Sequence, residues 1–174
     1  MNLSLDCLSD QTTNNLSNWK SRSYLESRLD SVTIAVTPNG LADAVVKEYF
    51  MLPYETQMPV SEFLDRMQPV DPVDSPPDPF SWKRGSVPTH PPAYYIQSQN
   101  NNLHGEFKAL LNDIPQDIPF ATEALGKKPD AVNFWLGNSR SVTSFHRDHY
   151  ENIYHVVAGT KRFILYVSCK LSID

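Results

Sequence analysis

The balance of proline against glycine limits the fold of this chain more than any other feature of its sequence. Of the 174 residues, 14 are proline and only 6 are glycine. Because proline breaks helix interiors, this balance argues against a bundle of long helices and favours short elements joined by stiff connectors. The prolines concentrate between residues 69 and 92, which predicts a semi-rigid, proline-rich connector there.

Charge and cysteine content exclude several classes of protein. The formal net charge is −5, so no basic field is available for phosphate backbones, and we expect no nucleic-acid partner. No stretch approaches the roughly 20 apolar residues that span a bilayer, so we expect no membrane contact. The two cysteines, Cys7 and Cys169, match neither a disulfide framework nor a zinc pattern. These features predict a cytoplasmic protein, with the nucleus as a second compartment.

Short periodic segments predict a mixed chain that is mainly β with flanking helices. Residues 1–18 are polar and irregular, which indicates a loose leader. Helices are expected at Trp19–Leu29, at Ser61–Met67 with Ser61 as N-cap, and more weakly at Leu103–Leu111. Strands are expected at Ser31–Thr37, Ala93–Gln97 and Ala131–Gly137.

The C-terminal third has the texture of a β-sandwich or barrel. Ile153–Val157 and Arg162–Val167 are both rich in strand-forming residues, and Ala158-Gly159-Thr160-Lys161 separates them. This pattern predicts a β-hairpin in a run of short antiparallel strands.

His-Arg-Asp-His at 146–149 is the first candidate for chemistry. In an extended strand, residues two apart point to the same side, so His146 and Asp148 would aim an imidazole nitrogen and a carboxylate at one point. Two histidines and one carboxylate form the facial triad of non-haem Fe(II) oxygenases, and this pair would supply two of the three ligands. The ordinary alternative is a strand histidine beside a turn aspartate.

Two further side chains suit a dicarboxylate cosubstrate. Lys161 follows the hairpin turn and would neutralise the distal carboxylate, and the Thr143 hydroxyl would donate to the same group. The alternatives are a solvated turn lysine and a threonine that only favours the strand.

Three stretches, Asp130–Gly137, Ser141–Tyr154 and Val156–Phe163, closely resemble the JmjC (Jumonji-C) family. The resemblance implies a double-stranded β-helix of the cupin type, Fe(II), and 2-oxoglutarate as cosubstrate. The implied activity is hydroxylation of a protein side chain, in particular lysine, with a translation-factor-class GTPase as protein substrate and a homodimer as assembly. By the same resemblance His146 and Asp148 are iron ligands, Thr143 and Lys161 bind the 2-oxoglutarate carboxylate, and Tyr95 and Asn152 line the cosubstrate pocket.

The second histidine of the triad has no candidate at the position the resemblance implies. His149 and His155 have the opposite strand parity to His146. We therefore expect residues 19–174 to be the N-terminal portion of a JmjC/cupin-like domain, a truncated form that lacks the second half of the barrel and is inactive alone. The alternative function is a catalytically inactive cupin-like module that binds other proteins. A zinc hydrolase is disfavoured because the chain lacks an H-E-x-x-H pattern.

Overall fold

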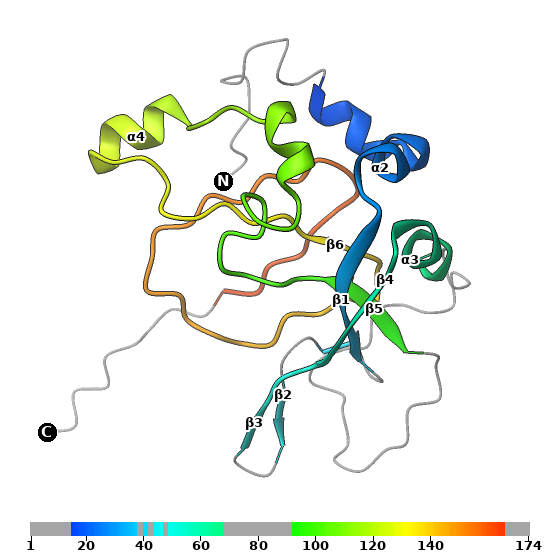
Figure 1. Cartoon of the computed structure of the whole chain (residues 1–174). Helices are drawn as coiled ribbons and strands as arrows, with labels where there is room; N and C mark the ends of the chain where they lie inside the picture. Colours follow the sequence, from blue (N-terminus) through cyan, green and yellow to red (C-terminus); the bar gives the residue numbers. More distant parts are fainter. Residues whose placement is uncertain (1–14, 38–39, 42–43, 47–48, 68–91, 166–174) are drawn as a thin grey trace, which may run out of the picture.

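The computed structural model describes residues 15–37, 40–41, 44–46, 49–67 and 92–165 (Figure 1). The expected connector, apart from Pro92, and the first 14 residues of the expected leader lie outside this part of the chain. The elements in chain order are η1 (Asn18–Lys20), α2 (Arg22–Arg28), β1 (Ser31–Thr37), β2 (Ala44–Val46), β3 (Tyr49–Met51), β4 (Tyr54–Pro59), α3 (Val60–Arg66), β5 (Ala93–Ile96), η2 (Lys108–Asp113), α4 (Pro119–Leu125) and β6 (Leu136–Gly137).

A four-stranded antiparallel sheet organises the molecule, with strand order β4-β1-β5-β6. β1 is central because it is long enough to pair with β4 along most of its length and with β5 at its C-terminal end, where Ala35 lies opposite Tyr95. A separate two-stranded ribbon is formed by β2 and β3. The arrangement is mainly β with flanking helices, as the sequence predicts.

The two faces of this sheet have different roles. Alternate residues of β1, Val32 and Ile34, are fully buried on one face, where α2, α3 and η2 contribute further core side chains (Figure 1). The core side chains are Leu25, Leu29, Val32, Ile34, Met58, Val60, Phe63, Ile96, Leu103, Phe107, Leu110 and Phe134. Ala35 and its partner Tyr95 lie on the opposite face, and that face carries the candidate site.

Most of the locally encoded elements form where they are expected. The helix expected at 19–29 is realised as η1 and α2, and the strands at 31–37 and 93–97 are realised as β1 and β5. The helix expected at 61–67 forms as α3, but Ser61 is not its N-cap. β4 runs directly into α3 through Pro59, whose φ of −54° already suits a helix entry, so Ser61 lies inside the first turn.

One helical prediction needs correction, and one helix was not predicted. Residues 103–107 form turns rather than a helix, and only Lys108–Asp113 winds into the 3₁₀ helix η2. The Asn102 carbonyl accepts from the amides of Gly105 and Phe107, which closes the chain into turns before a helix can start. The helix that was not predicted is α4, which begins at Pro119 and is followed by Gly126 as C-cap in the left-handed conformation, with φ of 68°.

The predicted C-terminal hairpin is wrong for the described part of the chain. Residues 151–165 run without regular secondary structure, shown in orange to red in Figure 1. Strand-forming side chains need a neighbouring strand to bury them, and here Ile153, Phe163 and Leu165 are 50%, 55% and 87% exposed. Likewise, only Leu136–Gly137 of the strand expected at 131–137 joins the sheet.

This exposed apolar segment gives a first prediction. Replacing Ile153 and Leu165 together by lysine is expected to lower self-association and the fluorescence of a bound hydrophobic dye, because both side chains lie largely in solvent. The thermal midpoint should hold, since neither residue belongs to the core. Asn18→Lys, which adds the same charge at an exposed polar position in η1, is the control and should change dye binding little. Unchanged association in the double variant would contradict the prediction.

No helix in the described residues is both long and apolar enough to cross a membrane.

Candidate functional site

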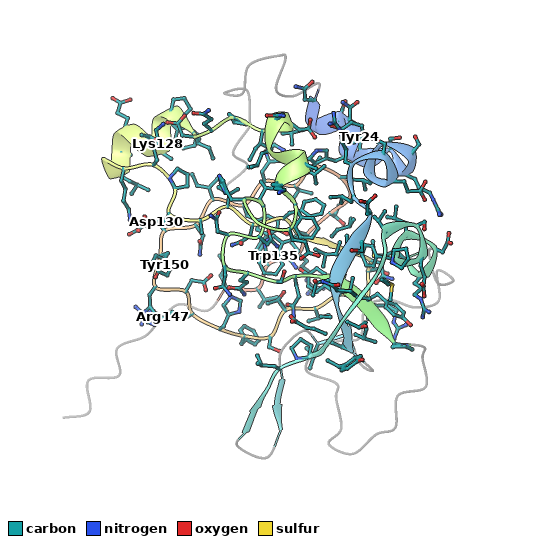
Figure 2. All side chains as sticks on the ribbon, in the orientation of Figure 1. Tyr24, Lys128, Asp130, Trp135, Arg147 and Tyr150 are labelled. Atoms are coloured by element: carbon teal, nitrogen blue, oxygen red, sulfur yellow. The ribbon has the colours of Figure 1, made fainter. Side chains whose placement is uncertain are left out.

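The structure brings the six predicted site residues into two groups. Tyr95, Thr143 and Lys161 form one, named here the tyrosine cluster. His146, Asp148 and Asn152 form the other, named here the His–Asp loop. Figure 2 shows Trp135 near the centre of the molecule, and Arg147 and Tyr150 from the same loop at its outer edge.

Strand β5 places Tyr95 at the centre of the tyrosine cluster. The side chain is only 4% exposed, and its ring packs against Trp135 with centroids 5.9 Å apart. Lys161 Nζ donates a hydrogen bond to Tyr95 Oη at 3.3 Å and lies 5.6 Å from the ring centroid. Gly137 permits this packing, because a Cβ there would lie 2.7 Å from Tyr95 Cδ2. A half-buried ammonium is thus held beside a buried phenol.

Burial keeps the Tyr95 phenol protonated. Loss of hydration raises its pKa above the ordinary value of 10.0, and a hydrogen bond with Thr143 opposes that rise more weakly. A neutral phenol can accept from Lys161 and still donate its own proton to an anion. The tyrosine cluster therefore combines one cation with two hydroxyl groups, a donor set suited to a carboxylate.

These tyrosines predict a loss of stability in alkali. The pKa is raised by burial for Tyr95, for Tyr154, and for Tyr24, whose hydroxyl also donates to Asp113. A group with a raised native pKa contributes stability that is complete below its unfolded pKa, about 10, and is lost as the pH rises through the native pKa. Unfolding free energy should therefore fall above about pH 10. Urea titrations at a series of pH values measure the unfolding free energy, and tyrosinate absorbance follows the ionisation of the phenols.

Tyr95→Phe is expected to make that alkaline loss shallower, because it removes the most buried of the three phenols. Tyr150→Phe, at a position 72% exposed, should leave the profile unchanged. If Tyr95→Phe does not change how the unfolding free energy falls with pH, the alkaline loss of stability does not come from the Tyr95 phenol.

The His–Asp loop presents two metal-ligand donors toward each other. His146 Nδ1 donates to the Ser144 carbonyl at 2.8 Å, a pairing that requires the proton on Nδ1 and leaves the Nε2 lone pair free. Nε2 lies 3.6 Å from Asp148 Oδ2, and both side chains are about half exposed. Donors that bind one ion at about 2.0–2.2 Å can lie no more than about 4.4 Å apart, so this pair fits a shared ion.

The fit covers two ligand positions. Within the described ranges, no third histidine, cysteine, aspartate or glutamate joins this pair to complete a metal-binding group. His149 is exposed beside the pair, while His155 lines a shallow groove with Leu16 and Lys20 of the N-terminal segment.

Asn152 is hydrogen-bonded to Asp148 rather than to a residue of the tyrosine cluster. Its side-chain Nδ2 donates to Asp148 Oδ2 at 2.9 Å. The carboxylate oxygen that faces His146 is therefore also the one that Asn152 binds.

Sequence reasoning missed three contributors to the site. Trp135 packs on Tyr95, the Ser144 carbonyl fixes the His146 ring, and Tyr154 interacts electrostatically with Lys161 and Tyr95. A backbone carbonyl has no signature in sequence. The only signal for the contact between His146 and the Ser144 carbonyl was therefore that the two residues lie two positions apart.

Comparison with known proteins gives consistent matches. The model of the family described as "Cupin-like domain" matches residues 7–172. The human "Bifunctional peptidase and (3S)-lysyl hydroxylase JMJD7" is 44% identical over 135 residues, covering 78% of this chain and 37% of that protein. "JmjC domain-containing protein E" of Dictyostelium discoideum is 40% identical over 167 residues, covering 86% and 43%. "Lysine-specific demethylase JMJ32" of Arabidopsis thaliana is 38% identical over 149 residues, covering 84% and 39%. The chain spans less than half the length of each of these relatives.

Proposed function

The chain belongs to the cupin-like family, in its JmjC branch, and from that premise we propose that it supplies two iron ligands and the cosubstrate site of an Fe(II)- and 2-oxoglutarate-dependent protein hydroxylase. His146 and Asp148 are the two ligands. The observation that carries the proposal is the free Nε2 of His146 facing the Asp148 carboxylate at 3.6 Å. Iron, when bound, supplies the oxidative decarboxylation of 2-oxoglutarate that is coupled to hydroxylation.

The tyrosine cluster binds and orients the cosubstrate in this proposal. Lys161 neutralises the distal carboxylate of 2-oxoglutarate, and the hydroxyl groups of Thr143 and Tyr95 donate to it. Trp135 and the sheet exclude water behind Tyr95, which strengthens the attraction between the ammonium and the carboxylate. Because the diacid is short, fixing this end also limits where its other end can reach.

Lysine is the substrate side chain that best fits the relatives. The names of the human and Arabidopsis relatives, a lysyl hydroxylase and a lysine-specific demethylase, both refer to lysine. We propose hydroxylation of a lysine in a protein partner, with a translation-factor-class GTPase as the candidate and the cytoplasm as the compartment. The exposed acidic side chain of Glu151, in the His–Asp loop, suits a cationic substrate.

The second candidate function is a catalytically inactive cupin-like module that binds proteins. Two observations favour it: the described residues provide two metal donors rather than three, and the segment at 153–165 exposes large apolar side chains. A module of this kind needs neither iron nor 2-oxoglutarate.

Ligand binding by the 174-residue chain separates the two functions. The hydroxylase proposal expects 2-oxoglutarate to bind in calorimetry with Mn(II) present, and expects His146→Ala to weaken the metal while His149→Ala does not. Binding of neither ligand would reject it and leave the interaction module. We expect no succinate release from this chain alone, because two donors hold an open ion weakly. Stoichiometric, iron-dependent succinate release would reject that expected inactivity.

A further inference from the structure

We infer that Asn152 is a positioning residue for Asp148, which sets the carboxylate for the metal through a side-chain hydrogen bond; the inference rests on the proposed function. The observation is the 2.9 Å hydrogen bond from Asn152 Nδ2 to Asp148 Oδ2. An asparagine in this place would otherwise be assigned to the cosubstrate, as the family resemblance implies.

The carboxylate needs such a partner because of its exposure. The Asp148 side chain is 47% exposed, so in the absence of a partner it would sample several rotamers in water. A carboxylate has about four lone-pair positions, and Asn152 uses one on Oδ2, which leaves the others for an ion. The bond keeps the carboxylate turned toward His146 before the ion arrives.

His146 is held by the same kind of contact. Its Nδ1 donates to the Ser144 carbonyl at 2.8 Å, which selects the tautomer that leaves Nε2 free. Both metal donors therefore have a hydrogen-bonded partner inside residues 144–152. The local chain sets up this half of the site without help from the tyrosine cluster.

Metal affinity tests the role of Asn152 without any turnover. Co(II) is titrated alone, without 2-oxoglutarate, into the full chain, followed by its absorbance and by paramagnetic broadening of the His146 ring protons. Asn152→Ala should weaken Co(II) binding about 10- to 100-fold, the usual effect of removing a partner that orients a ligand. Asn152→Gln, which keeps an amide donor, should recover part of the affinity. Asn18→Ala, at an exposed position in η1, should have no effect.

A double-mutant cycle tests whether Asn152 changes Co(II) affinity through Asp148. If Asn152 acts through Asp148, then adding Asn152→Ala to Asp148→Ala should cause no further loss of Co(II) affinity. In the metal-free chain, Asp148→Ala should also shift the side-chain amide resonances of Asn152. An equal loss in both backgrounds would overturn the inference, as would unchanged affinity in Asn152→Ala. Failure of the unmodified chain to bind Co(II) would reject the metal role of His146 and Asp148 as well.

Discussion

Asn102→Ala is expected to lower the free energy of unfolding by about 3 kcal/mol or more, because each buried polar group left without a partner costs roughly 1–3 kcal/mol. The Asn102 side chain is 6% exposed and bonds three backbone groups. Its Nδ2 donates to the carbonyls of Ser98 and Phe134, and its Oδ1 accepts from the Phe134 amide at 2.7 Å. Alanine removes all of these bonds and leaves a small cavity.

The damage should extend to the site, because Phe134 directly precedes Trp135. Asn102 bonds both backbone groups of Phe134 as a neighbouring strand would, and Asn101 Oδ1 accepts from Val132 in the same way. Without that support, Trp135 loses its fixed position against Tyr95. Near-ultraviolet circular dichroism should therefore lose aromatic signal in Asn102→Ala even in conditions where the chain remains folded.

Urea unfolding measures the stability effect, with Asn18→Ala as the exposed control. Asn102→Asp keeps an acceptor for the Phe134 amide but loses both donated bonds, so it too should be strongly destabilised. A loss below about 1 kcal/mol for Asn102→Ala would mean that water replaces these bonds and that the side chain is not a structural support.

The elements that sequence predicts well here are those whose causes are local. The β-branched run Ser31–Thr37 forms β1 with Val32 and Ile34 fully buried, and Arg22–Arg28 forms a helix with Leu25 turned to the core. Membership in the cupin-like family confirms the expected fold class, a partial cupin-type β fold with flanking helices. Proline at N1 and a left-handed glycine also mark α4, a local signal that the sequence analysis did not use.

The strand predictions that failed have a common physical cause: a strand forms only where a neighbouring strand is available to pair with it. Residues 131–135 have the composition of a strand, but asparagine side chains hold them instead of a neighbouring strand. Residues 153–157 and 162–165 also favour a strand, yet no strand pairs with them in the part of the chain that the structure describes. Strand propensity reports how well a residue suits a pleated surface and says nothing about which surface is present.

In the candidate site too, the sequence predicts contacts between residues close in the chain and not those between distant ones. The sequence predicts that His146 and Asp148 approach one another, and the structure places them 3.6 Å apart, although the loop is not the strand on which that prediction was based. The link between Lys161 and Tyr95 joins residues 66 positions apart, so no periodicity could have suggested it. Only the resemblance to a family placed both residues in one pocket.

Lys161→Ala is expected to weaken 2-oxoglutarate binding by about 100-fold, or about 2.7 kcal/mol, within the range for truncating one partner of a desolvated charge pair. Lys161 is the ammonium of the tyrosine cluster, and its Nζ lies 3.3 Å from the buried Tyr95 hydroxyl. Alanine would leave the distal carboxylate of 2-oxoglutarate facing two neutral hydroxyl groups in a site that Tyr95 and Trp135 keep partly dry. Calorimetry with 2-oxoglutarate, in the presence of Mn(II), measures the change.

Three comparisons separate charge from packing in that result. Tyr95→Phe removes one hydroxyl but keeps the cation, so its loss of affinity should be smaller than that of Lys161→Ala. Lys128→Ala, in an exposed loop, should bind 2-oxoglutarate normally. Added salt should reduce the affinity of the unmodified chain more than that of Lys161→Ala, because only the former attracts the carboxylate with this ammonium. Normal binding by a folded Lys161→Ala would identify Lys161 as the solvated turn lysine that the sequence alone also allows.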